Sequence, residues 1–305
     1  IQDRLEELSE IFAIDVASFA VLDNHFHVLT HLDVKAPRKW SKEDVLRRWA
    51  KLYPPRDARR RPLRNLKRWV REKQSDHKFV NAIRKRLVNL GWFMKSLKEP
   101  LSRMANEADG TDGAFWSARY KSIAVMDLPA LLATSVYIDL NPFAAGVVKL
   151  PEEARFTSLF LRIGLCRRRP RFSGLQAARP GAVIGTRQRP SMETVSWLCP
   201  IEDQRARGAR KTGLVDGLSL ANYLLVVDAT SRLVRRRKAS LSPDARPLLE
   251  RLGTTVEAWR TAIESLFSRS IPSGVAFAFD RKRLRDADKK RGCRSVANLN
   301  GCPTS

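Results

Sequence analysis

Hydrophobic residues recur every three or four positions over residues 1–13, with acidic residues on the remaining positions. This spacing predicts an amphipathic helix. The following residues are rich in β-branched and aromatic side chains up to Asp23-Asn24, a turn pair, and an extended pattern then resumes up to Asp33. We therefore expect the helix to be followed by a β-hairpin whose turn lies at residues 23–24.

Helical spacing returns over residues 41–53, 79–97 and 128–140, and the last of these is expected to end at the Asn-Pro pair that follows it. Residues 114–125 have the aromatic and β-branched content of a strand. Helices mixed with hairpin-forming strands predict an α+β fold, with an antiparallel sheet and helices packed on one of its faces.

The composition changes after residue 165. Residues 166–190 hold seven arginines, three prolines and three glycines but no acidic residue, which predicts a linker. Short helical patterns then follow over residues 219–228, 242–252 and 254–267. We predict an α+β domain over residues 1–165, a basic linker over 166–205 and a mainly helical accessory region over 206–305.

The chain is strongly basic, with 57 lysine and arginine residues against 32 acidic ones and a formal charge of +25. Such a charge favours a polyanionic partner, most commonly nucleic acid. Apolar runs end well before the length of a membrane-spanning helix, and the four cysteines form no CxxC pair. We therefore expect a soluble protein in a reducing cytoplasm, without a disulfide framework or a structural zinc site.

Three of the four histidines, His25, His27 and His31, lie within seven residues. Alternate residues of a strand share a face, so His25 and His27 can point at one metal ion while Phe26 and Val28 enter the core. His31 is expected to flank such a site. The competing interpretation is a pair of surface or hydrogen-bonded histidines on a sheet face.

Tyr137 and Asn141 are four positions apart and hence on one face of the predicted helix. A phenol is a poor nucleophile at neutral pH because its pKa is about 10, and an adjacent cation would make its attack feasible. Asn141 could help to hold that cation. The competing interpretation for Tyr137 is a structural helix residue.

Three motifs stand in a distinctive order: FAVLDNHFHVL over residues 19–29, FWSARYKS over 115–122, and YIDLNPFAAGVV over 137–148. Together they resemble the single-tyrosine HUH transposases, most closely the REP-associated tyrosine transposases and their longer transposase-like relatives. The resemblance covers residues 1–165 and implies an HUH, ferredoxin-like catalytic domain.

In that family two histidines and a polar residue four positions after the tyrosine hold a divalent ion. The resemblance therefore implies that His25, His27 and Asn141 bind Mg²⁺ or Mn²⁺ and that Tyr137 is the nucleophile. It implies nicking and transfer of single-stranded DNA at DNA hairpins through a 5′-phosphotyrosine intermediate. A bacterial protein of this kind would act on the nucleoid, as a monomer or homodimer.

Recognition of a DNA hairpin implies contacts with its backbone. Residues 54–73 contain nine basic and two acidic residues, so they form either a solvated basic helix or a phosphate-contacting segment. Trp69 or Trp116 could stack an unpaired base, whereas a core position for Phe115 and Trp116 and a structural or DNA-contacting role for Tyr120 are the plainer expectations. The expected DNA-contacting residues are Arg119, Lys121, Arg59, Arg60, Arg61, Arg64, Lys67, Arg68 and Trp69.

The family's sheet begins with a strand ahead of the first helix, next to the histidine strand, whereas this sequence starts at Ile1 with a helical pattern. We therefore expect a truncated chain and a gap in the middle of the sheet. Two other classes of function stay open. One is a protein that binds structured DNA without cutting it, and the other is an RNA-binding protein, for which no RNP-type or KH-type signature is present.

Overall fold

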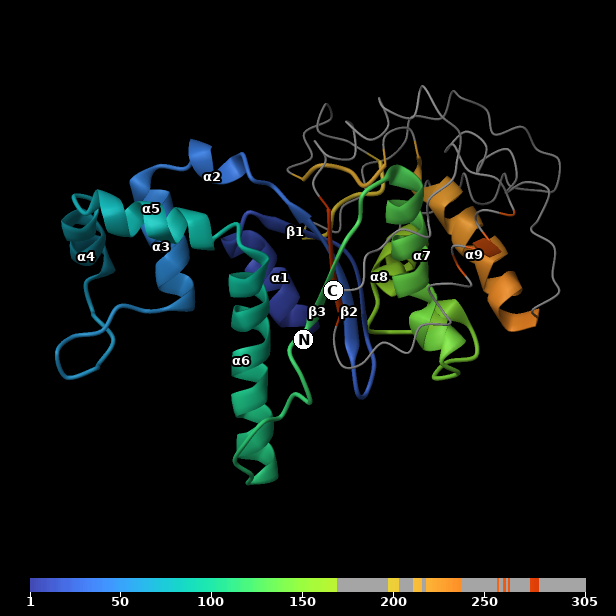
Figure 1. The fold of residues 1–305 in the computed structure, drawn as a ribbon, viewed down its shortest axis with the longest axis horizontal. Coiled ribbons are helices and arrows are strands. Elements are labelled where there is room, and N and C mark those ends of the chain that lie inside the picture. Colours follow the sequence, from blue (N-terminus) through green and yellow to red (C-terminus); the bar gives the residue numbers. More distant parts are fainter. Residues whose placement is uncertain are drawn as a thin grey trace. The chain divides into compact units, whose positions relative to one another are not determined.

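The chain forms an α+β structure with a four-stranded mixed sheet, in the strand order β1-β2-β4-β3 (Figure 1). The computed structural model describes residues 1–168, 197–202, 211–215, 218–236, 257, 260, 261, 263 and 275–279. The strands are β1 (Ile14–Val21), β2 (Phe26–Leu32), β3 (Lys121–Ala124) and β4 (Val275–Phe279). The predicted α+β class is therefore confirmed, and the predicted hairpin corresponds to β1 and β2.

The α-helices are α1 (Gln2–Ile11), α2 (Ala36–Lys39), α3 (Lys42–Leu52), α4 (Leu66–Lys73), α5 (His77–Arg86), α6 (Leu90–Asp109), α7 (Leu128–Ala144), α8 (Ser158–Arg168) and α9 (Leu220–Arg236). A 3₁₀ turn, η1, spans Pro151–Glu153. No helix in the described part of the chain is both long and apolar enough to cross a membrane.

The chain divides into two compact units, and each is described by itself. The first comprises residues 1–16 and 31–119, and the second comprises residues 17–30 and 120–305. The expected boundaries at residues 165 and 205 differ from this division, because the unit that contains the hairpin tip also contains α9 and β4. The helices predicted over residues 242–252 and 254–267 lie wholly or mainly outside the described residues.

The first unit consists mainly of helices whose ends are fixed by local hydrogen bonds. Ser41 and Asp44 form a capping box that starts α3. Asn89 caps α6 by accepting a hydrogen bond from Trp92 N, so the predicted single helix over 79–97 is divided into α5 and α6. Helix α6 continues past Pro100 and ends at Gly110, which has a φ of 60°.

The second unit contains the tip of the hairpin (residues 17–30), β3, β4 and helices α7 to α9. Its apolar core includes residues from all sides of α7 and from β1, β2, α9 and β4. The predicted end of α7 was wrong, because the helix includes Pro142 and continues to Ala144. The proline removes one amide donor, but the burial of most of α7 outweighs this loss.

Two expectations for the sheet were wrong. The sheet is mixed, not antiparallel, because β4 runs parallel to β3, with Lys121 opposite Val275 and Ala124 opposite Ala278. The position beside β2 at which we expected a gap is occupied by β4, the red strand in Figure 1. The predicted strand over 114–125 is limited to Lys121–Ala124, since residues 114–119 form bends and loops.

Candidate active site

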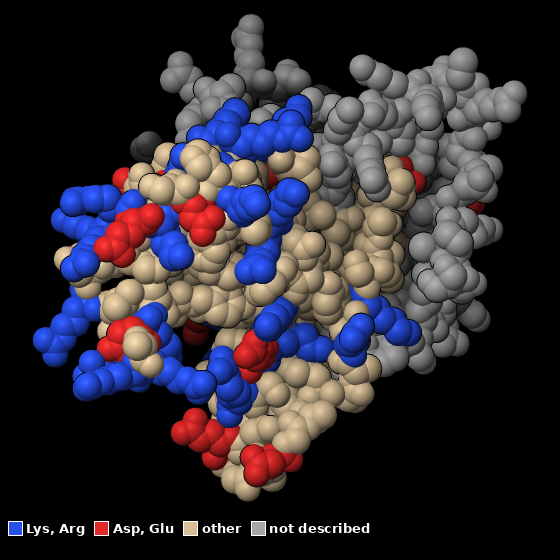
Figure 2. Space-filling view, turned by 60° about the vertical axis from the view of Figure 1, so that its left-hand side comes forward, with Lys and Arg blue, Asp and Glu red and all other residues tan. Residues whose placement is uncertain are grey.

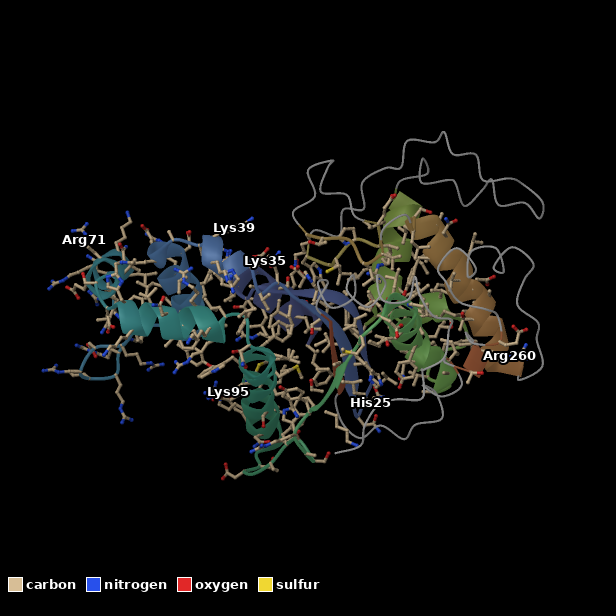
Figure 3. The ribbon with its side chains drawn as sticks, turned by 45° about the horizontal axis from the view of Figure 1, so that its top comes forward. His25, Lys35, Lys39, Arg71, Lys95 and Arg260 are labelled. Atoms are coloured by element: carbon tan, nitrogen blue, oxygen red, sulfur yellow. The ribbon has the colours of Figure 1, made fainter. Side chains whose placement is uncertain are left out.

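The β1–β2 hairpin brings two imidazoles together at the start of β2. Its turn is closed by a hydrogen bond from Leu22 N to the His25 carbonyl, 2.9 Å long. The ring centroids of His25 and His27 are 5.0 Å apart, with the planes at 79°. His25 lies half-buried at the tip of the hairpin (Figure 3), whereas His27 is only 1% exposed. Phe26 and Val28 are fully buried, as the strand alternation predicted.

His27 is a buried polar side chain without a polar partner. Neither Nδ1 nor Nε2 of this ring has a hydrogen-bond partner among the described residues. Burial, together with a smaller electrostatic effect of His25, lowers the pKa of His27 to about 3, so the ring is neutral near pH 7. A neutral imidazole with an available lone pair is the form that binds a metal ion.

The ring of His25 is oriented by its neighbour in the turn. Its Nδ1 lies 2.6 Å from Oδ1 of Asn24. Since an amide oxygen can only accept, the Nδ1–H group donates this hydrogen bond and Nε2 carries the lone pair. Metal-binding histidines are commonly oriented in this way, with one nitrogen bonded to an acceptor and the other directed at the ion.

Helix α7 contributes the phenol and the amide. The Tyr137 ring centroid lies 5.4 Å from that of His27, with the planes at 66°. Asn141, one turn further along, makes a side-chain hydrogen bond with Tyr137 that lowers the pKa of the phenol.

The phenol of Tyr137 is not activated by the protein alone. Its side chain is 3% exposed. Burial raises the pKa of Tyr137 to about 12, although the hydrogen bond with Asn141 acts in the opposite direction. Tyr137 is therefore protonated at neutral pH, and a nearby positive charge is required to make it a nucleophile.

The described side chains fit a divalent cation through nitrogen and amide oxygen. Among the described residues no group of three or more His, Cys, Asp and Glu is suited to a metal ion; the candidate ligand set is the one that the sequence predicted, two imidazoles and the Asn141 amide. The unpaired nitrogens of His27 are the observation that supports this fit, because a bound cation would satisfy one of them. Such a mixed set suits Mn²⁺ somewhat better than Mg²⁺.

Strand β4 packs next to Tyr137 and β2, and we did not predict this strand from the sequence. The ring of Phe277 lies 6.4 Å from that of Tyr137, centroid to centroid. Thr30 Oγ1 of β2 donates a 3.0 Å hydrogen bond to the Phe277 carbonyl. The signal was available in the run Val275 to Phe279, where valine, alanine and phenylalanine alternate directly after a glycine.

The other two histidines have different surroundings. Nδ1 of His31 lies 3.3 Å from Oδ2 of Asp15, within the first unit. His77 is at the start of α5, with Nε2 3.3 Å from Nζ of Lys42. Tyr120 is partly buried, and burial raises the pKa of its phenol. None of these contacts indicates a second metal centre.

Eight of the nine expected DNA-contacting residues are exposed, and Trp69 is partly buried. All but Lys121 belong to the first unit, and lysine and arginine side chains gather on the face of the molecule that Figure 2 shows. Asp57 organises the 54–65 loop by accepting hydrogen bonds from the amides of Arg59 and Arg61, both 2.9 Å long. In the same unit, Lys39 and Arg71 point away from their helices (Figure 3). The exposed basic residues of the expected set are Arg59, Arg60, Arg61, Arg64, Lys67, Arg68, Arg119 and, in the second unit, Lys121.

The aromatic residues of this region have mixed environments. Trp69 on α4 is partly buried and contacts Phe79, with ring centroids 6.5 Å apart. Trp116 donates from Nε1 to the Lys98 carbonyl at 3.2 Å. The core position expected for Phe115 was wrong, because this side chain is 46% exposed. It lies in a loop, so no sheet face covers it.

Comparison of the chain with protein-family models, with curated proteins and with solved structures found no match.

Proposed function

We propose that this protein nicks single-stranded DNA beside a hairpin and transfers the cut strand, as a single-tyrosine HUH transposase does. The proposal includes an HUH-like, ferredoxin-related arrangement of the sheet and of α7. The observation that carries it is the meeting of His25 and His27 with Tyr137 and Asn141, from segments more than 100 residues apart, around a buried imidazole without a hydrogen-bond partner.

The proposed reaction is a transesterification. The Tyr137 oxygen attacks the scissile phosphorus, a tyrosine O–P bond forms and the bond from phosphorus to the 3′ oxygen breaks. The phenolic proton is lost to solvent, and the leaving 3′ oxygen takes a proton from solvent to become a hydroxyl. The 5′-phosphotyrosine keeps the phosphodiester's free energy, so attack by another 3′-hydroxyl reverses the step without a nucleotide cofactor.

The residues around Tyr137 have separate parts in this proposal. His25, His27 and Asn141 would hold Mg²⁺ or Mn²⁺, which when bound polarises a phosphate oxygen and stabilises negative charge. The hydrogen bond between Asn141 and Tyr137 lowers the pKa of the phenol and so favours the phenolate. The hydrophobic neighbours of Tyr137, including Phe277, exclude water and thereby strengthen these electrostatic interactions.

The basic helices of the first unit would bind the DNA backbone. Residues 35–86 carry 20 lysine and arginine residues against five acidic ones, and those on α4 and in the 54–65 loop are exposed, except for the partly buried Lys73. This charge supplies affinity for phosphates without base specificity. Such a protein would act on chromosomal DNA.

The burial of Tyr137 favours a second candidate function, the binding of structured DNA without cleavage. A hydroxyl on a side chain that is 3% exposed can meet a scissile phosphate only if neighbouring side chains move. In this second function the same basic surface binds a hairpin, while Tyr137 is a packed helix residue.

A covalent-adduct assay separates the two. The protein is incubated with Mn²⁺ and a hairpin oligonucleotide that has a single-stranded flank and a labelled 3′ end, and products are run under denaturing conditions. We expect a labelled protein band that is absent from Tyr137→Phe and from reactions with chelator. Tyr120→Phe is the matched control, because it removes the same atom from the other tyrosine near the motifs.

Hairpin binding without a band in the wild type would select the non-cutting function. A band that persists in Tyr137→Phe would reject Tyr137 as the nucleophile.

A further inference from the structure

A buried polar network lies on the opposite side of α7 from the candidate site. Asp139 is 0% exposed. Its Oδ1 accepts hydrogen bonds from the Ser158 hydroxyl and from Leu159 N, the latter 3.1 Å long. Its Oδ2 accepts a 2.6 Å hydrogen bond from the Tyr223 hydroxyl and lies 3.5 Å from the guanidinium of Arg162. A buried carboxylate with this many donors is fixed in position.

The same network ties α7 to β1, α8 and α9. The Tyr223 hydroxyl of α9 is also 2.9 Å from Ser135 Oγ of α7, which in turn lies 2.6 Å from Ser18 Oγ of β1. Arg162 of α8 donates a 2.6 Å hydrogen bond to the Ala17 carbonyl of β1. Tyr223 and Arg162 are at most 1% exposed, so water cannot replace these bonds.

The position of Asp139 in the helix connects this network to the chemistry. It lies two residues after Tyr137 and two before Asn141. Successive residues of an α-helix are about 100° apart, so Asp139 projects from the face opposite both of them. Any rotation of α7 about its axis that breaks the bonds of Asp139 also moves Tyr137 and Asn141 relative to His27.

We propose that Tyr223 is a positioning residue: its hydroxyl, bonded at once to Asp139 and Ser135, fixes the rotation of α7 and thereby holds Tyr137 and Asn141 beside His27. The effect on catalysis rests on the proposed function, whereas the effect on the rotation of α7 does not. The inference assigns α9, in the region expected to be an accessory domain, to the catalytic unit itself.

Tyr223→Phe tests the proposal with the full chain, because it removes one oxygen and keeps the ring in the core. The chain has only four tyrosines, so ring-labelled tyrosine gives few NMR signals and each can be assigned by a Tyr→Phe change. Tyr53→Phe, on α3's C-terminal side in the first unit, is the matched control. Adduct formation from the hairpin oligonucleotide with Mn²⁺ is measured in parallel.

We expect Tyr223→Phe to shift the Tyr137 ring signal and to lower the adduct-forming kcat about tenfold, with the oligonucleotide KM unchanged. Tyr53→Phe should do neither. A lower melting temperature alone, with the Tyr137 signal and kcat per folded molecule at control values, would overturn the proposal. A shifted signal with an unchanged kcat would overturn it as well.

Failure of the proposed function would be visible separately. If wild-type protein forms no adduct, the transposase proposal fails, and the Tyr137 signal then decides alone whether Tyr223 fixes α7. Should Tyr223→Phe not fold, Ser135→Ala removes one of the two partners of the hydroxyl, and a smaller displacement of the same signal is expected from it.

Discussion

His27 is the central residue of the candidate site. Its buried environment favours the binding of a cation at the expense of the stability of the fold. Its two ring nitrogens are buried without hydrogen-bond partners among the described residues. A buried polar group without a partner costs about 1–3 kcal/mol relative to one that is satisfied. The unpaired imidazole therefore lowers the stability of the metal-free protein, and a bound cation would remove this cost.

Replacement of His27 by leucine therefore has opposite effects on stability and on metal binding. We expect His27→Leu to raise the free energy of unfolding of the metal-free protein by about 1 kcal/mol, because no buried nitrogen is left unsatisfied. The variant should also lose any rise in melting temperature with Mn²⁺. Chemical denaturation without metal and thermal melts with and without Mn²⁺ measure the two effects.

His25→Leu serves as the control, since this half-buried ring already has Asn24 as a partner. It should lose the Mn²⁺ effect without the gain in stability. A marked loss of stability in metal-free His27→Leu would show that the imidazole has a structural role instead.

At the residue scale, the sequence was informative where spacing defines a face. Alternation in a strand placed His25 and His27 on one face, four-residue spacing in a helix did the same for Tyr137 and Asn141, and the family resemblance linked the two pairs. Spacing does not show which side chains from distant segments meet. Asp139 and Tyr223 are 84 positions apart, so their hydrogen bond could not be predicted.

At the element scale, β4 is the feature on which the sheet depends. It lies between β2 and β3, so its backbone has partners on both sides. Val125 N also donates a 2.9 Å hydrogen bond to the Ala278 carbonyl. A proline in a central strand removes a hydrogen bond of the ladder and disturbs the pairing around it.

Ala276→Pro should therefore expose the amides of residues 121–125 to rapid hydrogen exchange. Ala276→Gly is the matched control, because it keeps the amide and should leave these residues protected. Hydrogen exchange followed by mass spectrometry measures the difference. Unchanged protection of residues 121–125 in Ala276→Pro would contradict the pairing of β3 with β4.

The start of α3 permits a prediction about pH. Ser41 Oγ donates a 2.7 Å hydrogen bond to Asp44 Oδ2. This bond is the main reason that the pKa of Asp44 is lowered, and the Ser41 amide adds to it. Because the folded pKa is below the unfolded one, the stabilisation is complete above pH ~4 and is lost as pH falls through the folded value.

Asp44→Ala should accordingly lower the free energy of unfolding by at most about 1 kcal/mol at pH 7 and have a much smaller effect near pH 2. Urea denaturation across this pH range measures the difference, with Asp112→Ala in an exposed loop as the control. A destabilisation of equal size at both pH values would show that Asp44 acts through something other than its charge.

Helix starts were predictable at this scale because capping bonds join residues three positions apart, as Ser41 and Asp44 do. Strand pairing was not, because β3 and β4 are separated by about 150 residues and their pairing depends on the whole core. The expected gap in the sheet arose from this limit, since local patterns do not show which distant strand completes a sheet.

At the scale of the whole molecule, the excess positive charge is concentrated in one part of the sequence. Residues 35–86 carry a net charge of +15 out of +25. If this surface binds DNA, each phosphate contact releases counterions, and affinity falls with salt in proportion to the number of contacts.

Replacement of Arg59, Arg60 and Arg64 by alanine should reduce the slope of log Kd against log salt by about 2 to 3. The adduct-forming rate at saturating DNA should not change. A triple alanine variant at Lys95, Arg103 and Lys149 removes the same charge elsewhere, and we expect it to alter the slope by less than about 1. Equal slopes for both variants would show that total charge, not this surface, governs binding.

The central claim is that His25, His27 and Asn141 hold one divalent cation beside Tyr137. A crystal of the protein grown with Mn²⁺ tests it directly, because the ion can be located by its anomalous scattering. The account predicts one strong peak about 2.0–2.4 Å from a ring nitrogen of each histidine and from the Asn141 amide oxygen. A saturating Mn²⁺ concentration with no peak there, or with a peak bound to other residues, would contradict it.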